Sequence, residues 1–535
     1  MQPTQLGIPI PTWRTNQEET IQKIVEVDKP VFVLEAPTGT GKTFIGAGAA
    51  RLMAQKGKPK AVYLVTTKHL QDQISTPPPR GLGGLPYYAM LKGKNNYVCG
   101  EDEERTAEDC GNCPVGSGCP YRTAKRRARE AGLTVLNYAY WLTIVNMSGE
   151  FSAALGTDKH DKGDFDFIVC DEADTIEDQL MNYISVSFTE GELGKLVNMG
   201  APSPEALATP EDWHKWALAA LPVMAGKLKT LDKEMEKHRE EFMQQAPVPL
   251  VRERTRLANK YTKLTTFVDE FEWSPWVITI EQSPRTGRRW ELKPVIVAPF
   301  ANGVMWRHAS RSLHMSATIL NAGQYCRNLG IPDYKENAVV RSLPCLFPVD
   351  NRRVKYQPVT EMKRDNREQA WPKMTEAIGK ILKAHPNEKG IVHTVSYQFA
   401  RYLIENLRDK RLLSHESGDR DSTVRFFHDA KDPLVLVSPS INRGVDFRDD
   451  AARFNIVAKV PYPYLGDAQI QARVNMPGGW QWYSYKTVST LVQSTGRTTR
   501  ADDDWSVSYI LDSEFDRLYK QQNALFPGWW KEALV

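Results

Sequence analysis

The sequence predicts an α/β fold in which parallel sheets are built in two successive sets. Residues 31–34 form an aliphatic run, Val-Phe-Val-Leu, typical of a strand buried on both faces. A glycine-containing loop follows it, and the alanine-rich residues 45–53 read as a helix. A second series of strand and helix patterns begins at about Cys326, which indicates two α/β units.

The loop between this strand and helix has the composition of a phosphate-binding loop. Its glycines would let backbone N–H groups approach a triphosphate, and the helix N-terminus adds partial positive charge. Lys42 would reach the β- and γ-phosphates and Thr43 would ligate Mg²⁺, although Ala36 stands where the usual pattern begins with glycine. The nucleotide-site candidates are Thr38, Gly39, Thr40, Gly41, Lys42 and Thr43.

Composition limits the class of protein. The chain has 535 residues, 41% hydrophobic and 25% charged, which suits several ordinary globular domains. A formal net charge of +4 excludes a polycation, so any nucleic-acid site must be a local groove. The first residues lack a secretory signal, no apolar run could span a bilayer, and the seven cysteines are an odd number. We expect a reducing, cytoplasmic location and no membrane partner.

Polar residues occur on both sides of the loop. Arg14 and Gln17 suit the donor and acceptor edges of adenine, but a solvated helix start explains them equally well. The buried strand at 61–67 ends in Thr66 and Thr67. Their hydroxyls could contact a nucleic-acid backbone, or could cap the next helix.

Four cysteines then fall in one short, polar window. Only one pair has a two-residue gap, and the segment has too few apolar residues for a core, so metal binding is favoured over packing. Spacing alone does not choose between zinc and an iron–sulfur cluster. The flanks are basic and would suit phosphates or a solvated helix. The candidate ligands are Cys99, Cys110, Cys113 and Cys119.

Acidic residues follow the next buried strand, at 165–170. Asp171 and Glu172 stand at its carboxyl end, where paired acids suit Mg²⁺ coordination and activation of an attacking water. Over residues 176–291 the pattern changes to long, charged stretches with few glycines, which predicts an inserted helical hairpin. A strand pattern returns near 294–299. Ser316 and Thr318 then form a small hydroxyl pair that could relay between two ligands.

The second set of strands, near 390–394, 433–438 and 456–461, leads to a basic helix. Gln493, Gly496, Arg497 and Arg500 share one face of that helix, because they follow the spacing of 3 or 4 residues per turn. Two arginines beside a glycine are what an arginine finger needs. A solvated basic face is the alternative.

Taken in order, these motifs resemble those of the superfamily 2 iron–sulfur helicases of the XPD/DinG group. The resemblance rests on APTGTGKT, VTTKHLQDQ, the four cysteines, VCDEAD, MSAT, INRGVDF and QSTGRTTR, and covers nearly the whole chain. It implies two RecA-like parallel-sheet domains, an iron–sulfur cluster insertion and a helical arch insertion. The implied segments are domain 1 at 1–91, 131–178 and 291–325, the cluster at 92–130, the arch at 179–290 and domain 2 at 326–535.

The resemblance also implies residue roles and partners. ATP would lie between the domains, with Mg²⁺ on Thr43 and Asp171, and Glu172 would activate water. The four cysteines would hold a [4Fe–4S] cluster. The substrates would be single-stranded and forked DNA, with 5′→3′ movement by a monomer. The residues implied to sense the γ-phosphate or couple domain 2 to the nucleotide are Gln493, Arg497, Arg500, Gly444 and Asp446.

Two departures from the group leave rival functions open. The acidic motif ends in Asp174 where the group usually has histidine, and Arg443 stands where an acid is expected. The resulting Asp-Glu-Ala-Asp is typical of RNA helicases, although those carry histidine at the position of Gln493. The rivals are an RNA-directed ATPase and a strand-binding adaptor with an ATP-driven switch.

Overall fold

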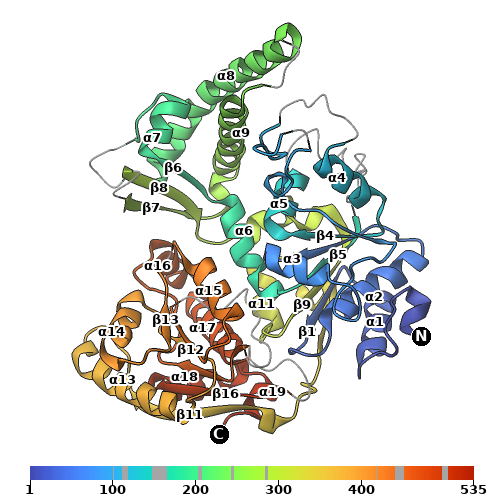
Figure 1. The fold of residues 1–535 in the computed structure, drawn as a ribbon. Helices are drawn as coiled ribbons and strands as arrows, with labels where there is room; N and C mark the ends of the chain where they lie inside the picture. Colours follow the sequence, from blue (N-terminus) through green and yellow to red (C-terminus); the bar gives the residue numbers. More distant parts are fainter. Residues whose placement is uncertain are drawn as a thin grey trace.

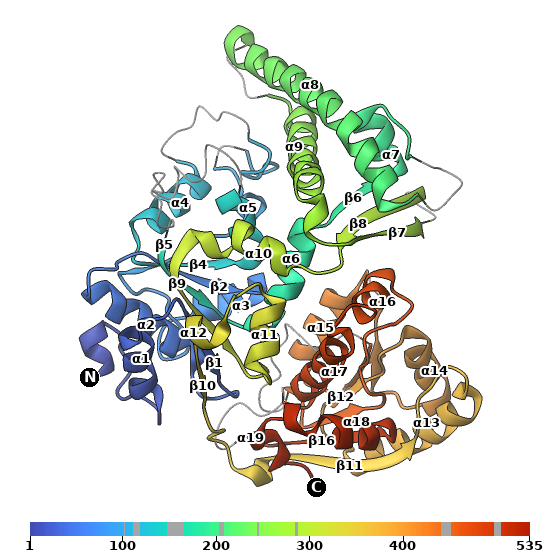
Figure 2. The ribbon, with the colours of Figure 1, turned by 180° about the vertical axis from the view of Figure 1, so that it is seen from behind.

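The computed structural model describes residues 1–100, 102–110, 118–146, 165–202, 208–242, 246–283, 287–416, 418–439, 451–496 and 504–535. Two lobes, each built on a parallel sheet, lie side by side, and a helical hairpin projects away from both (Figures 1 and 2). No helix in these described ranges is long and apolar enough to cross a membrane.

The first lobe is a parallel sheet with helices on both faces. Within the described residues it has seven strands. Val33 packs into one core, with Trp141 and Leu180, whereas Phe32 and Leu34 pack into the other. The aliphatic run at 31–34 is therefore buried on both faces, as expected. The strands, in spatial order, are β10 (Ala338–Ser342), β1 (Val31–Glu35), β9 (Ala309–Ser316), β5 (Phe165–Cys170), β2 (Ala61–Val65), β4 (Leu133–Asn137) and β3 (Tyr88–Met90).

Helices cover this sheet according to the apolar faces that they present. On one face lie α1 (Gln17–Glu26) and α2 (Lys42–Gln55), which bury Ile21, Ile24 and Ile45. The other face is covered by helices that share one continuous core with the helical hairpin. These are α5 (Tyr138–Asn146), α6 (Ile176–Ile184), α10 (Ala298–Val304) and α11 (Ala322–Asn328).

The second lobe repeats the plan with a parallel sheet of six strands in the described residues. Its order is β11 (Arg352–Thr360), β16 (Ser506–Asp512), β15 (Phe454–Val457), β12 (Gly390–His393), β14 (Val435–Ser438) and β13 (Leu412–Ser414). The flanking helices are α13 (Arg367–Ala384), α14 (Tyr397–Leu407), α15 (Arg420–Asp429), α16 (Ala468–Val474), α17 (Gly479–Thr495) and α18 (Glu514–Gln522). The α/β class predicted from the sequence is thus confirmed for both lobes.

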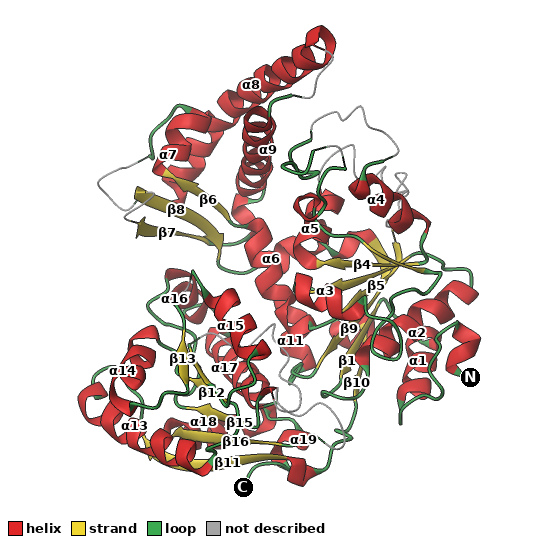
Figure 3. Cartoon of the chain, in the orientation of Figure 1, coloured by secondary structure: helices red, strands yellow, loops and turns green. Residues whose placement is uncertain are grey.

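The inserted region is partly as expected. Two long helices, α8 (Pro210–Phe242) and α9 (Val248–Asp269), form the predicted hairpin. A small antiparallel sheet that the sequence analysis missed supports it, with the order β6 (Val186–Thr189), β8 (Gly287–Pro294) and β7 (Trp276–Ser283) (Figure 3). The prediction of a strand near 294–299 is wrong, because β8 ends at Pro294 and α10 begins at Ala298.

The first lobe also extends further along the chain than expected. β10 pairs in parallel with β1, so residues 338–342 complete the first sheet although the expected boundary lies at residue 325. The sequence between this strand and β11 carries the chain to the second lobe. Its buried Phe347 lies against the loop that follows β1.

One half-buried arginine joins the first sheet to α1. Arg311 of β9 donates to the carbonyl oxygens of Ile24 at 2.6 Å, Val25 at 3.2 Å and Val27 at 2.5 Å, where α1 ends. These carbonyls have no intrahelical donor of their own, so the guanidinium completes the helix terminus. Burial lowers the pKa of Arg311, and its charge is retained.

We predict that Arg311→Met lowers the free energy of unfolding by about 2 kcal/mol, since hydrogen bonds from a charged donor are lost and the helix-end carbonyls are left without it. Urea unfolding followed by circular dichroism measures the change. The control is Lys380→Met, which breaks only an exposed Glu376–Lys380 pair on α13 and should change stability by less than about 0.5 kcal/mol. Equal effects of both substitutions would contradict this role for Arg311.

Candidate functional site

The loop between β1 and α2 is shaped by its glycines. Gly39 and Gly41 have φ angles of +85° and +73°, in the left-handed region that favours glycine. A Cβ at residue 39 would lie 1.9 Å from the Phe347 ring, and one at residue 41 would lie 2.3 Å from Gln17 Nε2. Glycine is required at both positions for conformation and for space.

Arg14 and Gln17 hold this loop from the side of α1. Gln17 Nε2 donates to the carbonyl oxygen of Thr40 at 3.0 Å, and Arg14 Nη1 donates to that of Gly39. Gln17 is 1% exposed, so the alternative of a solvated helix start does not hold for it. Within the loop, Lys42 Nζ donates to the carbonyl oxygen of Ala36 at 3.0 Å.

Asp171 lies next to this loop at the carboxyl end of β5. Burial raises its pKa, and the nearby charge of Lys42 acts in the opposite direction. Tyr63 of β2 donates its hydroxyl to Asp171 Oδ2 at 2.9 Å, and the Thr43 side chain lies near enough to act on the pKa of Tyr63. Tyr63 therefore lies beside the two oxygen donors that the sequence assigned to Mg²⁺. A hydroxyl-bearing ring in the middle of a buried strand was the available signal for this residue.

Glu172 has a conformation that is unusual outside glycine. Its φ is +47°, and its Oε2 accepts a hydrogen bond from Thr66 Oγ1 at 3.1 Å. The Thr66 hydroxyl thus faces an acid of the site. Thr67 instead accepts from the N–H of Leu70 at 3.2 Å and caps α3 (Lys68–Ile74), which is the alternative that the sequence left open.

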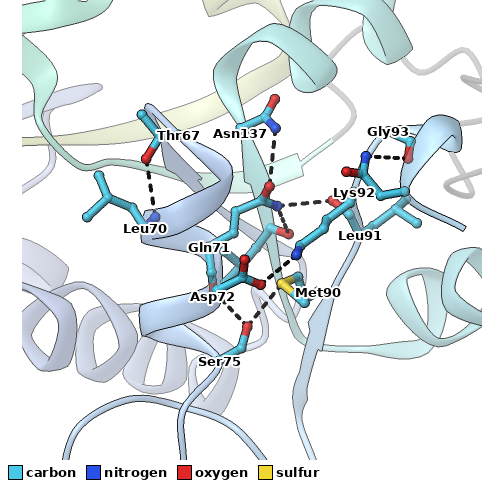
Figure 4. Close-up of polar contacts among 12 residues, drawn as sticks. Thr67, Leu70, Gln71, Asp72, Ser75, Met90, Leu91, Lys92, Gly93 and Asn137 are labelled. Carbon is cyan, nitrogen blue, oxygen red and sulfur yellow. Dashed lines mark hydrogen bonds and ion pairs between the residues drawn. The ribbon is translucent and has the colours of Figure 1, made fainter. Parts of the chain in front are cut away.

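The amides after β2 are used inside the first lobe, as Figure 4 shows. Gln71 is fully buried and donates to the carbonyl oxygen of Leu91 at 3.2 Å, while it accepts from Asn137 Nδ2 at 3.1 Å. Asp72 pairs with Lys92 at 2.5 Å. These contacts anchor α3 to the neighbouring strands, so Gln71 serves packing.

The hydroxyl pair at the end of β9 lies at the contact between the lobes. Ser316 Oγ donates to Asp174 Oδ1 at 2.5 Å, and its distance to Thr318 Oγ1 is 3.3 Å. From the second lobe, Gln493 Nε2 donates to Asp174 Oδ2 and, at 2.9 Å, to Thr318 Oγ1. Asp174, Ser316 and Thr318 are all buried. The structure thus brings together four side chains from three separate motifs.

The same helix, α17, makes a second set of contacts with the first lobe. Lys486 pairs with Glu177 at 3.1 Å and Asp178 at 3.0 Å, both on α6. Trp482 Nε1 donates to Glu177 at 3.0 Å. Because residues 482, 486 and 493 are four and seven positions apart, they present one face of α17 to the first lobe.

The end of α17 faces the glycine loop. Thr38 and Gly496 line one small cavity between the lobes, together with Phe347 and Trp529. The residues expected to reach the nucleotide beyond this point, Arg497 and Arg500, lie outside the described residues, as do Gly444 and Asp446.

The cysteine segment is described for Cys99, Cys110 and Cys119, whereas Cys113 lies outside the described residues. The three thiols are half-buried and not in disulfides. In the part of the chain that is described, no three His, Cys, Asp or Glu side chains are grouped to hold a metal ion.

An ion pair connects this segment with the helical hairpin. Asp109 Oδ1 lies 2.6 Å from Arg252 Nε of α9. The Arg252 guanidinium is the main reason that the pKa of Asp109 falls to about 2, and hydrogen bonds from Thr106 contribute. The carboxylate is therefore charged at neutral pH.

Two family models match the chain. A helicase C-terminal domain matches residues 378–533, and a type III restriction enzyme res subunit matches residues 10–190. These ranges fall in the second and the first lobe, so each lobe carries its own independent match.

Similar proteins span nearly the whole chain. An ATP-dependent DNA helicase, YoaA, of Haemophilus influenzae is 22% identical over 91% of this chain and 88% of its own length. The protein of the same name from Escherichia coli is 23% identical over 95% and 93%.

The fold has solved counterparts as well. An XPD helicase structure covers 96% of this chain and 98% of its own, with a TM-score of 0.60 and 17% identity. The S. tokodaii Xpd4 structure covers 98% and 100%, with a TM-score of 0.54 and 14% identity. The chain is thus similar in sequence to ATP-dependent DNA helicases along nearly its whole length, and its two-lobed fold is similar to that of the XPD structures.

Proposed function

We propose that this protein is an ATP-driven DNA helicase that moves 5′→3′ along single-stranded DNA and opens duplex ahead of it. The observation that carries the proposal is that helix α17 of the second lobe contacts the acidic and hydroxyl motifs of the first lobe and ends beside its glycine loop. Gln493 on α17 bonds Asp174 and Thr318 of the first lobe, and Gly496 lines the same cavity as the glycine loop. A nucleotide in this cleft can therefore change how the lobes meet.

ATP would be bound mainly by residues of the first lobe. Backbone N–H groups around Gly39 and Gly41 would hold the phosphates, with Lys42 turning from its loop carbonyl to the β- and γ-phosphates. Thr43 and Asp171 would hold Mg²⁺, since hydroxyl and carboxylate oxygens are its preferred donors. When bound, the ion neutralises phosphate charge, while Glu172 orients the attacking water.

Closure of the lobes would depend on the second lobe's basic side chains. Arg497 and Arg500, four and seven residues after Gln493 in the sequence, would pair with the γ-phosphate. Hydrolysis removes that partner, and the contact across the cleft weakens. Alternating hold on the DNA backbone by the two lobes would then produce stepping along the strand.

The cysteine segment fits a [4Fe–4S] cluster by its donor chemistry. Its three described thiols are half-buried in a segment with little apolar core, and none is in a disulfide. Cys99, Cys110, Cys113 and Cys119 would hold the cluster, which when bound would stiffen the segment beside the arch formed by α8 and α9. Asp109 and Arg252 would keep these two parts together at the fork.

An RNA-directed ATPase is the second candidate, and the observation in its favour is Asp174, which completes the Asp-Glu-Ala-Asp tetrad. The ATPase rate with single-stranded DNA or RNA of equal length separates the two. Stimulation by RNA alone would favour this candidate, and a forked duplex that is bound but not opened would favour an adaptor.

We predict that Lys42→Ala abolishes ATP hydrolysis and the opening of a 5′-tailed duplex, while single-stranded DNA is still bound, because only the phosphate contact is lost. A radiolabelled phosphate-release assay and a gel-based unwinding assay measure both. Lys56→Ala, an exposed change at the far end of α2, is the control. Unwinding that survives in Lys42→Ala would refute the proposed mechanism.

A second prediction concerns iron. Cys110→Ser should remove iron and visible absorption from the purified protein, because a serine oxygen is a poorer ligand than a thiolate. Iron content is measured by a colorimetric assay on protein purified without air. Cys345→Ser, a half-buried thiol outside the segment, should leave the iron in place. A wild-type protein that holds zinc and no iron would rule out the cluster.

A further inference from the structure

An open pocket of about 630 Å³ lies at the carboxyl ends of the strands of the second lobe's sheet. Its lining includes Glu361 after β11, Thr394 after β12 and Asp512 at the end of β16. The cavity that the glycine loop shares with α17 instead includes Arg352, where β11 begins. Because β11 runs from Arg352 to Thr360, the two sites lie at opposite ends of the strands. At the usual rise per residue they are roughly 25 Å apart.

The pocket lies where α/β sheets commonly bind ligands. β14 and β15 pair with opposite sides of β12, so the chain changes direction across the sheet at β12. Val395, directly after β12 and Thr394, has a φ of +59°, which is strained for a β-branched residue. The backbone at the pocket is therefore held in a conformation that its sequence does not favour.

Aromatic rings form one side of the pocket. Tyr462 and Tyr483 stack at 5.7 Å between ring centroids, with 12° between their planes, and the Tyr483 hydroxyl donates to the Pro463 carbonyl at 2.9 Å. Tyr464, beside them, is 70% exposed, and its ring lies over Gly466, where a Cβ would be only 2.3 Å away. A held aromatic pair with an exposed neighbouring ring offers flat surfaces for a planar ligand.

The charges around the pocket favour an anion. Glu361 pairs with Lys363, and Glu514 pairs with Arg517. Asp512 accepts backbone N–H groups, among them that of Val460 at 2.9 Å.

Three further cations line the pocket. Arg364 and Arg367 are exposed and Lys459 is half-buried, and no ion pair of theirs is found among the described residues. Their charges are therefore available for phosphates, whereas the acidic side chains are already compensated.

We infer that this pocket binds an unstacked nucleobase of the single strand, with Tyr464 stacked on the base and the cations Arg364, Arg367 and Lys459 on the flanking phosphates. The inference rests on the proposed function, and it assigns to the second lobe a strand contact that recognises a base as well as the backbone. A purely phosphate-binding surface would not need the ring of Tyr464. A base in this pocket would hold the strand when the first lobe releases it.

The test measures binding of labelled oligothymidylate by fluorescence anisotropy over a range of salt concentrations. Tyr464→Ala should weaken binding about tenfold with an unchanged salt slope, because stacking is lost and phosphate contacts remain. The double variant Arg364→Ala/Arg367→Ala should reduce the slope of log K against log salt by about 1.5. The ATPase rate without DNA should be unchanged in both, since neither change touches the nucleotide site.

Matched variants keep this test decisive. Phe426→Ala removes another exposed ring, 60% exposed on α15 of the same lobe, and should bind as the wild type does. Tyr464→Phe should also bind as the wild type, because it keeps the ring. Equal binding by Tyr464→Ala and the wild type, or equal weakening in Tyr464→Phe and Tyr464→Ala, would overturn the base pocket and leave the helicase proposal intact. A wild-type protein that does not bind single-stranded DNA would instead overturn the proposed function itself.

Discussion

The arrangement of the two lobes depends on one buried carboxylate. The Asp174 carboxylate accepts a hydrogen bond from Ser316 Oγ of its own lobe at 2.5 Å and another from Gln493 Nε2 of the other lobe. A buried carboxylate that loses a hydrogen-bond donor is costly, typically by about 1–3 kcal/mol or more for a charged group. Separation of the lobes therefore has a defined energetic cost at the point where the acidic motif, the hydroxyl pair and α17 meet.

Further contacts along α17 extend the interface between the lobes beyond Asp174. The ion pairs of Lys486 with Glu177 and Asp178 lie on the same face of α17 as Gln493, farther from the nucleotide cleft. A rigid helix that is held at several points transmits a shift at its Gln493 end to the rest of the lobe boundary. In the proposed mechanism, this helix would carry a change at the phosphate loop to the proposed strand-binding pocket of the second lobe.

Sequence reasoning succeeded where chemistry and local pattern coincide. The strand at 31–34, its glycine loop and the acids after β5 are local signals, because each depends on residue types at fixed spacing after a buried strand. The structure brings Arg14 and Gln17 onto the carbonyl oxygens of the loop, and their predicted contact with adenine stays a prediction. The roles of all the site residues stay predictions, and the structure gives no position for Arg497, Arg500, Gly444, Asp446 and Cys113, which lie outside the described residues.

The sequence analysis failed where the partner is distant in the chain. Nothing local to Tyr63 shows that its hydroxyl will donate to Asp171, and nothing local to residues 338–342 shows that they will pair with β1. The antiparallel sheet did have a local signal, because buried residues of β8 alternate with half-buried or exposed ones from Arg289 to Pro294. That period of two was present in the sequence and was obscured by the helical pattern before it.

The most direct test of the account is the ratio of unwinding to ATP hydrolysis in Gln493→Leu, which keeps the size of the side chain and removes its donor to Asp174. The account predicts that ATP still binds with wild-type affinity, while DNA-stimulated hydrolysis and unwinding both fall at least about tenfold, as expected when an interaction made in the closed state is lost. Gln521→Leu, an exposed change on α18, serves as the control. Full unwinding and full stimulation by DNA in Gln493→Leu would contradict the claim that this contact couples the two lobes.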